Sequence, residues 1–355
     1  MWLEPGDEQQ ALVDAVRSVL DDVATPASVR ARADGGSFDR AAWTTLGELG
    51  VFGIGVAEAD GGLGLGMVEL ALVLESVGRS ALSAPVLETA VVVAPLLAAT
   101  SDDRRGLLDG VVGGDLVATA TLSSGSTLAT DAQDADMIAT LGPTVRLDRP
   151  SRFRVRPQQS MASGRGVCVV EPSTEAQEVV GPTADDLLPR ILVANSALLL
   201  GNAAALVERT LDYVAERRQF DRPIASFQAV KHRLADAHVE LEASRAAVWA
   251  AAVDLDEGPA TQARAAAHTA AAIVGEAAEF ANDMALQLHG GIGYTWEYDL
   301  QLWLKQGIVL GRRLGRPARH RRRALELRVA SIAGSTGTAT AVGSRPSADT
   351  TEVTP

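Results

Sequence analysis

The stretch at residues 216–228, which reads ERRQFDRPIASFQ, separates two long segments of helical periodicity and decides how the second half of the chain folds. Pro223 lacks an amide hydrogen and its ring blocks the preceding turn, so it cannot continue a helix. We therefore expect one helix to end near Phe220 and the next to begin at once. Helical spacing of apolar residues extends on both sides of this corner, over residues 191–216, 224–254, 261–288 and 299–329. Four long helices suit an up-and-down bundle, which we assign to residues 187–330.

The first half of the chain predicts two further domains. Residues 1–114 form an N-terminal helical domain, with helical spacing over residues 7–24, 43–50, 67–78 and 85–99, the last kinked near Pro95. Residues 115–186 form a small middle β domain, because short alternating runs there are separated by Gly, Ser, Asp and Pro. Residues 331–355 lack periodicity and are expected to be a disordered tail. The fold class is therefore mainly α with a small β domain.

Composition excludes several classes of protein. The net charge of −13 repels the phosphates of a nucleic acid over most of the surface, so we expect no nucleic-acid partner. One cysteine and five scattered histidines argue against a zinc-ribbon or finger site, and we expect no metal. Cys168 is interpreted as a buried strand thiol. We see no signal peptide and no apolar run that spans a bilayer, and we expect a cytoplasmic protein without membrane insertion.

Residues 312–328 depart from the acidic average, with eight arginines and one glutamate. They form either a solvated basic helix end or a phosphate-facing patch for a nucleotide or an acidic partner. The dinucleotide fingerprint is absent, because the glycine pairs 62/64 and 291/293 are followed by Met67 and Trp296 where a third glycine is needed.

The corner at residues 216–228 carries candidate chemistry. Arg217, Arg218 and Arg222 cluster beside Phe220, and planar guanidinium groups next to an aromatic ring suit a ligand with a phosphate and a ring. The alternative is an ordinary helix end, where cations favour the C-terminal dipole.

A second candidate segment is QLHGGIGYT at residues 287–295, where three glycines end a long helix. One glycine suffices for a helix cap, and the others allow a ligand or another backbone to approach closely. His289 either contacts a ligand or caps the helix.

These two segments, in this order and at this distance, resemble the acyl-CoA dehydrogenase family. The resemblance extends over about residues 5–330 and includes LGELG at residues 46–50, EADGGLG at 58–64 and LESVGR at 74–79. It implies a helical domain, a middle β domain and a C-terminal four-helix bundle, and α,β-desaturation of an acyl-CoA thioester.

The resemblance also implies FAD, held between subunits. The family places the flavin ring against the β domain of one subunit, and the pyrophosphate and adenine against the bundle of its partner. The positions that match FAD contacts are Arg217, Phe220, Gln228, Gln287, Gly290 and Gly291. An electron-transfer flavoprotein is the implied electron acceptor.

The chain departs from the family pattern at the flavin ring and the catalytic base. Residues 120–126 read ATLSSGS, without the Glu and Pro of the usual loop, and no Trp occurs between Trp43 and Trp249. The positions where a base glutamate is expected fall at Leu314 and, for the alternative base, at Ile191. Glu297 is interpreted as a carboxylate at a helix N-terminus. The catalytic residues of this chain are unknown.

Three hypotheses follow. The first is the degenerate subunit of a heteromeric, α2β2 actinobacterial acyl-CoA dehydrogenase, for acyl groups such as steroid-derived thioesters, which needs a second dehydrogenase-like chain. The second is a structural or interaction subunit without flavin. The third is a self-associating, self-sufficient homotetramer that uses an unusual base.

Overall fold

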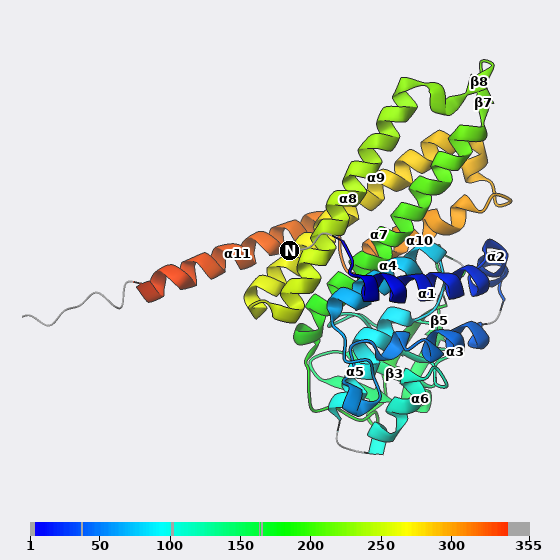
Figure 1. Ribbon diagram of the computed structural model, residues 1–355. Coiled ribbons are helices and arrows are strands. Elements are labelled where there is room, and N and C mark those ends of the chain that lie inside the picture. The colour runs from blue at the N-terminus through cyan, green and yellow to red at the C-terminus, as the bar shows by residue number, and fades with distance from the viewer. Residues whose placement is uncertain (1–3, 37, 101–102, 163, 165, 340–355) are drawn as a thin grey trace, which may run out of the picture.

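The computed structural model describes residues 4–36, 38–100, 103–162, 164 and 166–339. It confirms a mainly helical chain with a small β region (Figure 1). Long helices form one end of the molecule, and the N-terminal helices pack with the strands at the other end.

The N-terminal part contains short and medium helices around an apolar core. The central helix is α4 (Met67–Ser80), and the others are α1 (Asp7–Val23), α2 (Pro26–Ala33), α3 (Arg40–Glu48), α5 (Ala94–Ala99) and α6 (Leu108–Val112). The predicted distortion near Pro95 is present as a π-helical segment, Glu88–Val93, that runs directly into α5. Helix α2 escaped prediction because its eight residues carry no clear apolar face.

Strands β1 to β6 form two three-stranded sheets, in the orders β1-β3-β4 and β2-β6-β5. The first holds β1 (Ala118–Ala120), β3 (Met137–Leu141) and β4 (Val145–Asp148), and the second holds β2 (Leu128–Thr130), β5 (Phe153–Pro157) and β6 (Val167–Pro172). Cys168 is fully buried in β6, as predicted, and burial raises the pKa of its thiol. The sequence did not predict β2 and β3, which are short and uniformly apolar or small.

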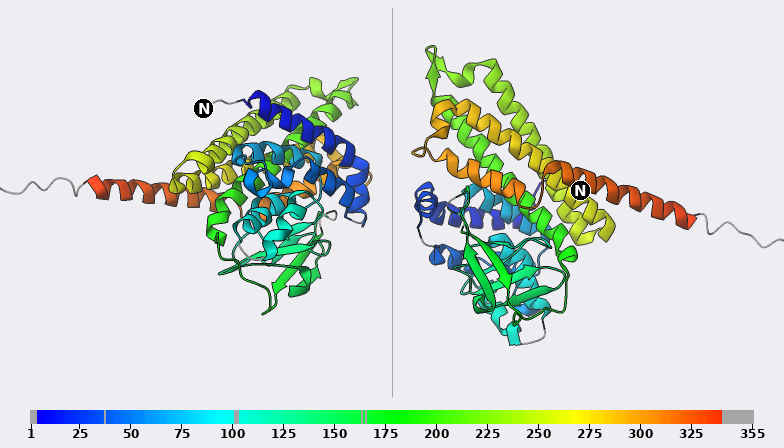
Figure 2. Two further views of the ribbon diagram at one scale, coloured as in Figure 1. Left: turned by 60° about the horizontal axis from the view of Figure 1, so that its bottom comes forward. Right: turned by 180° about the vertical axis from the view of Figure 1, so that it is seen from behind.

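The bundle is built on α7 (Ala184–Glu216), α8 (Gln228–Glu257) and α9 (Ala260–His289), which lie side by side in both figures (Figures 1 and 2). The predicted fourth helix is wrong as a single element. It is divided into α10 (Leu300–Arg312) and α11 (Pro317–Ala339) at Gly315, whose φ of +123° is incompatible with a helix.

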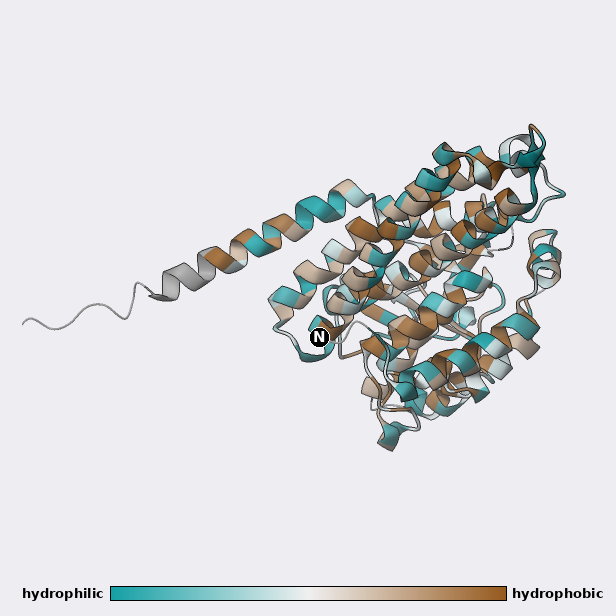
Figure 3. Cartoon of the chain, turned by 45° about the horizontal axis from the view of Figure 1, so that its top comes forward, coloured by the Kyte–Doolittle hydropathy of each residue, from teal (hydrophilic) through white to brown (hydrophobic). Residues whose placement is uncertain are grey.

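Helix α11 packs against α9 and then projects from the body of the molecule (Figure 2). It continues to Ala339, so the expected disordered tail is wrong for residues 331–339, and residues 340–355 lie outside the described part of the chain. Figure 3 shows a mixture of apolar and polar residues along the part of α11 that it colours.

Two glycines allow α4 and α7 to touch through their backbones. A Cβ atom on Gly201 would lie 1.9 Å from the carbonyl oxygen of Glu75, and one on Gly78 would lie 2.0 Å from that of Leu198. Glu75 also receives the guanidinium of Arg245 from α8 at 2.9 Å. The N-terminal domain is therefore locked to the bundle, so the bundle has a fixed orientation.

Helix α7 is the one described helix that is long and apolar enough to cross a membrane. Its apolar window is 89 % buried against the rest of the chain, so these side chains serve internal packing.

Candidate functional site

The corner at residues 216–228 contains a hairpin rather than a direct helix–helix junction. Helix α7 ends at Glu216, four residues before the predicted end, and the chain continues through β7 (Arg218–Gln219) and β8 (Arg222–Pro223). The reason is a tight turn at Phe220 and Asp221, whose φ values are +52° and +61°. Left-handed backbone at two successive positions matches the twist of paired strands and ends the helix early.

The hairpin exposes Phe220 to solvent at a braced turn. Its side chain is 86 % exposed, and the guanidinium of Arg218 donates to the carbonyl of Asp221 at 2.7 Å, which braces the turn. Arg222 lies over the Phe227 ring at 4.1 Å. A non-glycine residue with positive φ and an exposed ring are both costly, which is typical of a functional position.

Arg217 follows the last residue of α7, directly before the hairpin, and Gln228 is the first residue of α8 after it. Both side chains are exposed, and neither forms a hydrogen bond or ion pair within the described residues. The backbone of Arg217 is fixed, since its amide donates to the carbonyl of Tyr213 at 2.8 Å. Both side chains are therefore free to bind an external ligand.

The glycine segment forms a turn with open space above it. Gly290 follows the last residue of α9 with φ +62°, and a Cβ atom at Gly290 or Gly291 would meet no atom within 4 Å. Gln287 is exposed on the last turn of the helix. This surface leaves room for the close approach that a phosphate group requires.

The fold brings the two segments together at one end of the bundle (Figure 1), and we call residues 216–228 and 287–295 the bundle tip. Tyr213 and His289 join them, with rings stacked at a centroid distance of 4.3 Å and an interplanar angle of 18°. The chemistry of the tip suits FAD, because it offers an unpaired guanidinium, an amide, an exposed ring and an unobstructed glycine backbone. All six residues singled out from the sequence lie on it.

The expected positions of a catalytic base contain no carboxylate in the structure. Leu314 packs against the core between α10 and α11, and Ile191 is fully buried in α7. Glu297 is exposed in a turn, and the residue at the N-terminus of α10 is Asp299, which pairs with Arg30 at 2.5 Å.

Sequence reasoning missed a buried polar network next to Leu314. The guanidinium of Arg313 donates to Glu88 at 3.0 Å and to the side-chain oxygen of Asn195 at 2.6 Å, and Thr130 also donates to Glu88 at 3.0 Å. Glu88 is only 1 % exposed. This network joins all three parts of the chain. In the sequence its signal was Glu88, a single carboxylate within the otherwise largely apolar run 86–93.

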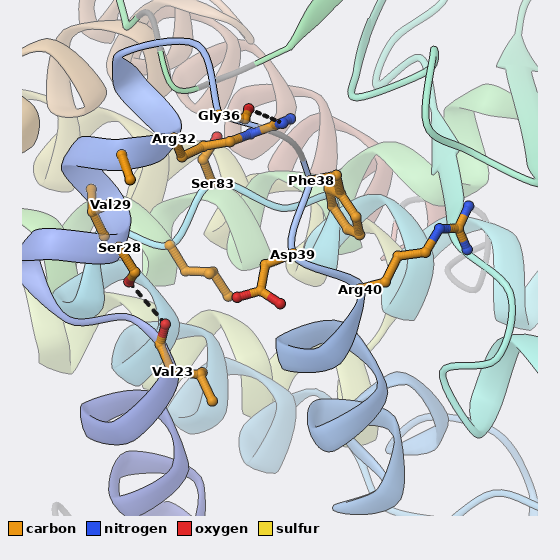
Figure 4. A pocket seen from close by; sticks show the side chains of 11 residues that line it. Val23, Ser28, Val29, Arg32, Gly36, Phe38, Asp39, Arg40 and Ser83 are labelled. Atoms are coloured by element: carbon orange, nitrogen blue, oxygen red, sulfur yellow. Dashed lines mark hydrogen bonds between the residues drawn. The ribbon is translucent and has the colours of Figure 1, made fainter.

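A cavity of about 360 Å³ lies elsewhere, between α2, the start of α3 and the loop after α4 (Figure 4). None of the six predicted residues lines it. Arg32 on its wall is already bound to Asp131 at 2.8 Å and to the carbonyl of Gly36 at 2.9 Å. Arg32 therefore connects α2 to the β region, and its guanidinium already has partners within the chain.

The basic segment at residues 312–328 is partly neutralised, because four carboxylates pair with five of its eight arginines among the described residues. Acidic residues of α9 pair with Arg312 and Arg321, Glu88 pairs with Arg313, and Glu326 pairs with Arg322 and Arg323. This favours the interpretation as a solvated helix over that of a phosphate-facing patch.

Comparisons with known proteins agree with this geometry. Residues 6–115 match the family model for the acyl-CoA dehydrogenase N-terminal domain, and residues 189–309 match that for the C-terminal domain. Acyl-CoA dehydrogenase IpdE2 of Mycobacterium tuberculosis is 32 % identical over 312 residues, which are 86 % of this chain and 92 % of that protein.

Two solved structures extend the comparison. A variant of the Tcur3481-Tcur3483 steroid ACAD superposes with a TM-score of 0.83 at 27 % identity, covering 92 % of this chain and 99 % of that one. The ChsE4-ChsE5 complex from Mycobacterium tuberculosis gives a TM-score of 0.80 at 26 % identity, over 91 % and 97 % of the two chains.

Proposed function

The chain belongs to the acyl-CoA dehydrogenase family, an oxidoreductase family acting on acyl-CoA, and from that premise we propose its role within such an enzyme. It is a subunit that completes the FAD site of a partner chain in an α2β2 assembly. The enzyme desaturates the α,β bond of an acyl-CoA thioester, and a steroid-derived acyl group fits the similarity to a steroid ACAD. The assembly is cytoplasmic and passes its electrons to an electron-transfer flavoprotein.

The observation that carries the proposal is the bundle tip, which is prepared for a ligand that this chain does not itself enclose. Phe220 is held outward by a strained turn, while Arg217 and Gln228 have no partner within the described residues. A protein that serves only as a scaffold gains nothing from such an arrangement, because exposed aromatics and left-handed backbone both cost free energy.

Each residue of the tip has a distinct role toward FAD. The guanidinium of Arg217 supplies a charge-assisted hydrogen bond to a phosphate, and Gln228 supplies a neutral one. Gly290 and Gly291 let the pyrophosphate approach the backbone. The bound FAD would supply the acceptor for the hydride that leaves the β-carbon of the acyl group.

The partner supplies the base that removes the α-proton. Leu314 and Ile191 occupy the expected positions in this chain, and neither can accept a proton. Glu88, the carboxylate nearest to Leu314 in the buried network, is committed to Arg313 and Thr130 and has no contact with solvent. Its role is therefore structural.

We test the proposal with Gly291→Ala in the chain co-purified with its partner. The added Cβ meets nothing within 4 Å in this chain, so folding stability should be unchanged. A pyrophosphate that approaches Gly291 would collide with it, at a cost of roughly 1–3 kcal/mol, which lowers FAD affinity about five- to hundredfold. Arg217→Ala should reduce FAD affinity about ten- to hundredfold through the lost charge-assisted bond.

The matched controls are Gly106→Ala, another exposed glycine with open space and ordinary φ, and Arg149→Ala, an exposed arginine outside the bundle tip. Both should leave FAD content unchanged. If Gly291→Ala and Arg217→Ala retain flavin as the controls do, the chain is a structural subunit without a flavin contact.

A further inference from the structure

The Tyr213–His289 stack joins two segments that are 76 residues apart in sequence and that both end at the bundle tip. Tyr213 lies in the last turn of α7, and its carbonyl accepts the amide of Arg217 at 2.8 Å. His289 is the last residue of α9 and directly precedes Gly290. The stack is therefore one residue away from the glycine turn and one helical turn away from the hairpin.

The imidazole of His289 is held in one orientation and one protonation state. Its Nδ1 lies 2.8 Å from the carbonyl oxygen of Ala285, and a carbonyl only accepts, so Nδ1 carries the hydrogen. Nε2 is buried without a hydrogen-bond partner among the described residues, and burial lowers the pKa of His289. Only 4 % of the residue is exposed, so the neutral ring behaves as a flat packing element.

The surroundings favour packing over charge as the role of this ring. Tyr298 completes the cluster, with its ring 5.4 Å from His289 and 6.2 Å from Tyr213. The hydroxyl of Tyr213 points to the backbone carbonyl of His289 at 3.5 Å. No described carboxylate forms a hydrogen bond or ion pair with the imidazole, as a catalytic or cationic histidine would require.

We propose that Tyr213 and His289 are positioning residues that fix the hairpin carrying Arg217 relative to the Gly290–Gly291 turn. This inference rests on the proposed function, since FAD needs both segments at one set distance. A histidine that only capped α9 would need its bond to Ala285 and no partner on α7. The stacked rings of Tyr213 and His289 instead hold the end of α7 and the end of α9 at a set distance from each other.

The test measures hydrogen exchange in the chain, without flavin. The reporter is the amide of Ile224, which donates to the carbonyl of Arg217 at 2.8 Å and closes the hairpin. His289→Ala, a change on α9, should speed exchange at Ile224 about two- to tenfold, as expected for an aromatic pair. His289→Phe keeps a stacked ring and should restore slow exchange.

A local cap predicts a different pattern. His289→Ala would then speed exchange only in the turn after α9, leave Ile224 unchanged, and overturn the inference. Tyr213→Ala provides the reciprocal arm, in which exchange at Gly290 should rise, because its amide donates to Leu286 in the last turn of α9. Core amides of α4 report whether either variant unfolds globally. Faster exchange at Ile224 or Gly290 is attributed to the lost stack only if these core amides still exchange slowly.

FAD retention by the partnered enzyme separates this inference from the proposed function. Coupling at Ile224 together with normal FAD binding by Gly291→Ala and Arg217→Ala overturns the proposed function alone. Loss of FAD in those two variants without coupling at Ile224 overturns the positioning role alone. Coupling together with lower FAD retention in His289→Ala, rescued by His289→Phe, supports both.

Discussion

At the scale of single residues, the bundle tip combines a costly backbone conformation with an exposed aromatic ring. Phe220 and Asp221 hold left-handed backbone in succession, each at a cost of the order of 1–3 kcal/mol. The twist of the paired strands explains the left-handed backbone, but the exposed ring of Phe220 needs a reason outside folding. A ligand that stacks on the ring of Phe220 supplies one.

Another residue-scale feature is the pair His268 and His320, which joins α9 to α11. Their Nδ1 atoms lie 3.0 Å apart, and desolvation, helped by His320 and by Arg323 and Arg319, lowers the pKa of His268 from 6.5 to about 4. Burial also lowers the pKa of His320. Both rings are therefore neutral near neutral pH.

We predict an acid-sensitive contribution to stability from His268. Below about pH 6.5 the imidazole of His268 is protonated in the unfolded chain, whereas in the folded chain it stays neutral down to about pH 4. The free energy of unfolding therefore falls as the pH decreases through this window. His268→Gln keeps a hydrogen-bonding amide and should flatten the dependence. Urea midpoints of both proteins at several pH values across the window measure this, and parallel curves would contradict it.

At the scale of elements, helices are bounded by contacts from elsewhere in the chain as well as by local caps. Helix α4 begins after Gly66, which has no side chain to cap it. The carboxylate of Asp256, at the end of α8, accepts the amides of Met67 at 2.8 Å and Val68 at 3.2 Å. An acidic group at a helix N-terminus also interacts favourably with the helix dipole.

We predict that Asp256→Ala lowers the free energy of unfolding by about 1 kcal/mol, the usual worth of a helix cap. Glu257→Ala is the matched control, because its neighbouring exposed carboxylate makes no bond to α4. Chemical denaturation of the two variants compares them. Equal stability would mean that water replaces Asp256 at the helix end.

At the scale of the whole molecule, the proposed function requires the chain to carry one half of a site and a partner to carry the other. At the bundle tip, the space above Gly290 and Gly291 is open to a ligand. The region near the expected base is instead filled by a network of side chains, those of Glu88, Arg313, Asn195 and Thr130. Helix α11 and the tip both extend from the body, at different ends (Figure 1). The proposed partner completes the flavin-ring side and provides the base.

We predict that the chain purified alone is colourless and that flavin appears on co-expression with its partner. The reason is that pyrophosphate contacts without a ring pocket supply only part of the binding free energy. Visible absorbance and the FAD released on denaturation measure the content of each preparation. Nearly one FAD per chain in the isolated protein would instead support the self-sufficient homotetramer.

The sequence by itself determined α1, α4 and the first three bundle helices, and it supplied the candidate residues of the tip. Helical periodicity and glycine runs are local properties. The spacing of apolar residues therefore predicted helices at residues 7–24 and 67–78 and the first three helices of the bundle. The resemblance then identified Arg217, Phe220, Gln228 and the glycine turn. What these signals share is that each lies within one continuous segment.

Only the tertiary structure decided the features that depend on distant segments meeting. The ion pair of Arg313 with Glu88 spans 225 residues, and the contact of Tyr213 with His289 spans 76. Spacing along a chain reports which face of an element is apolar, but not which partner that face or a buried charge will find, because the partner is set by how all the elements pack together.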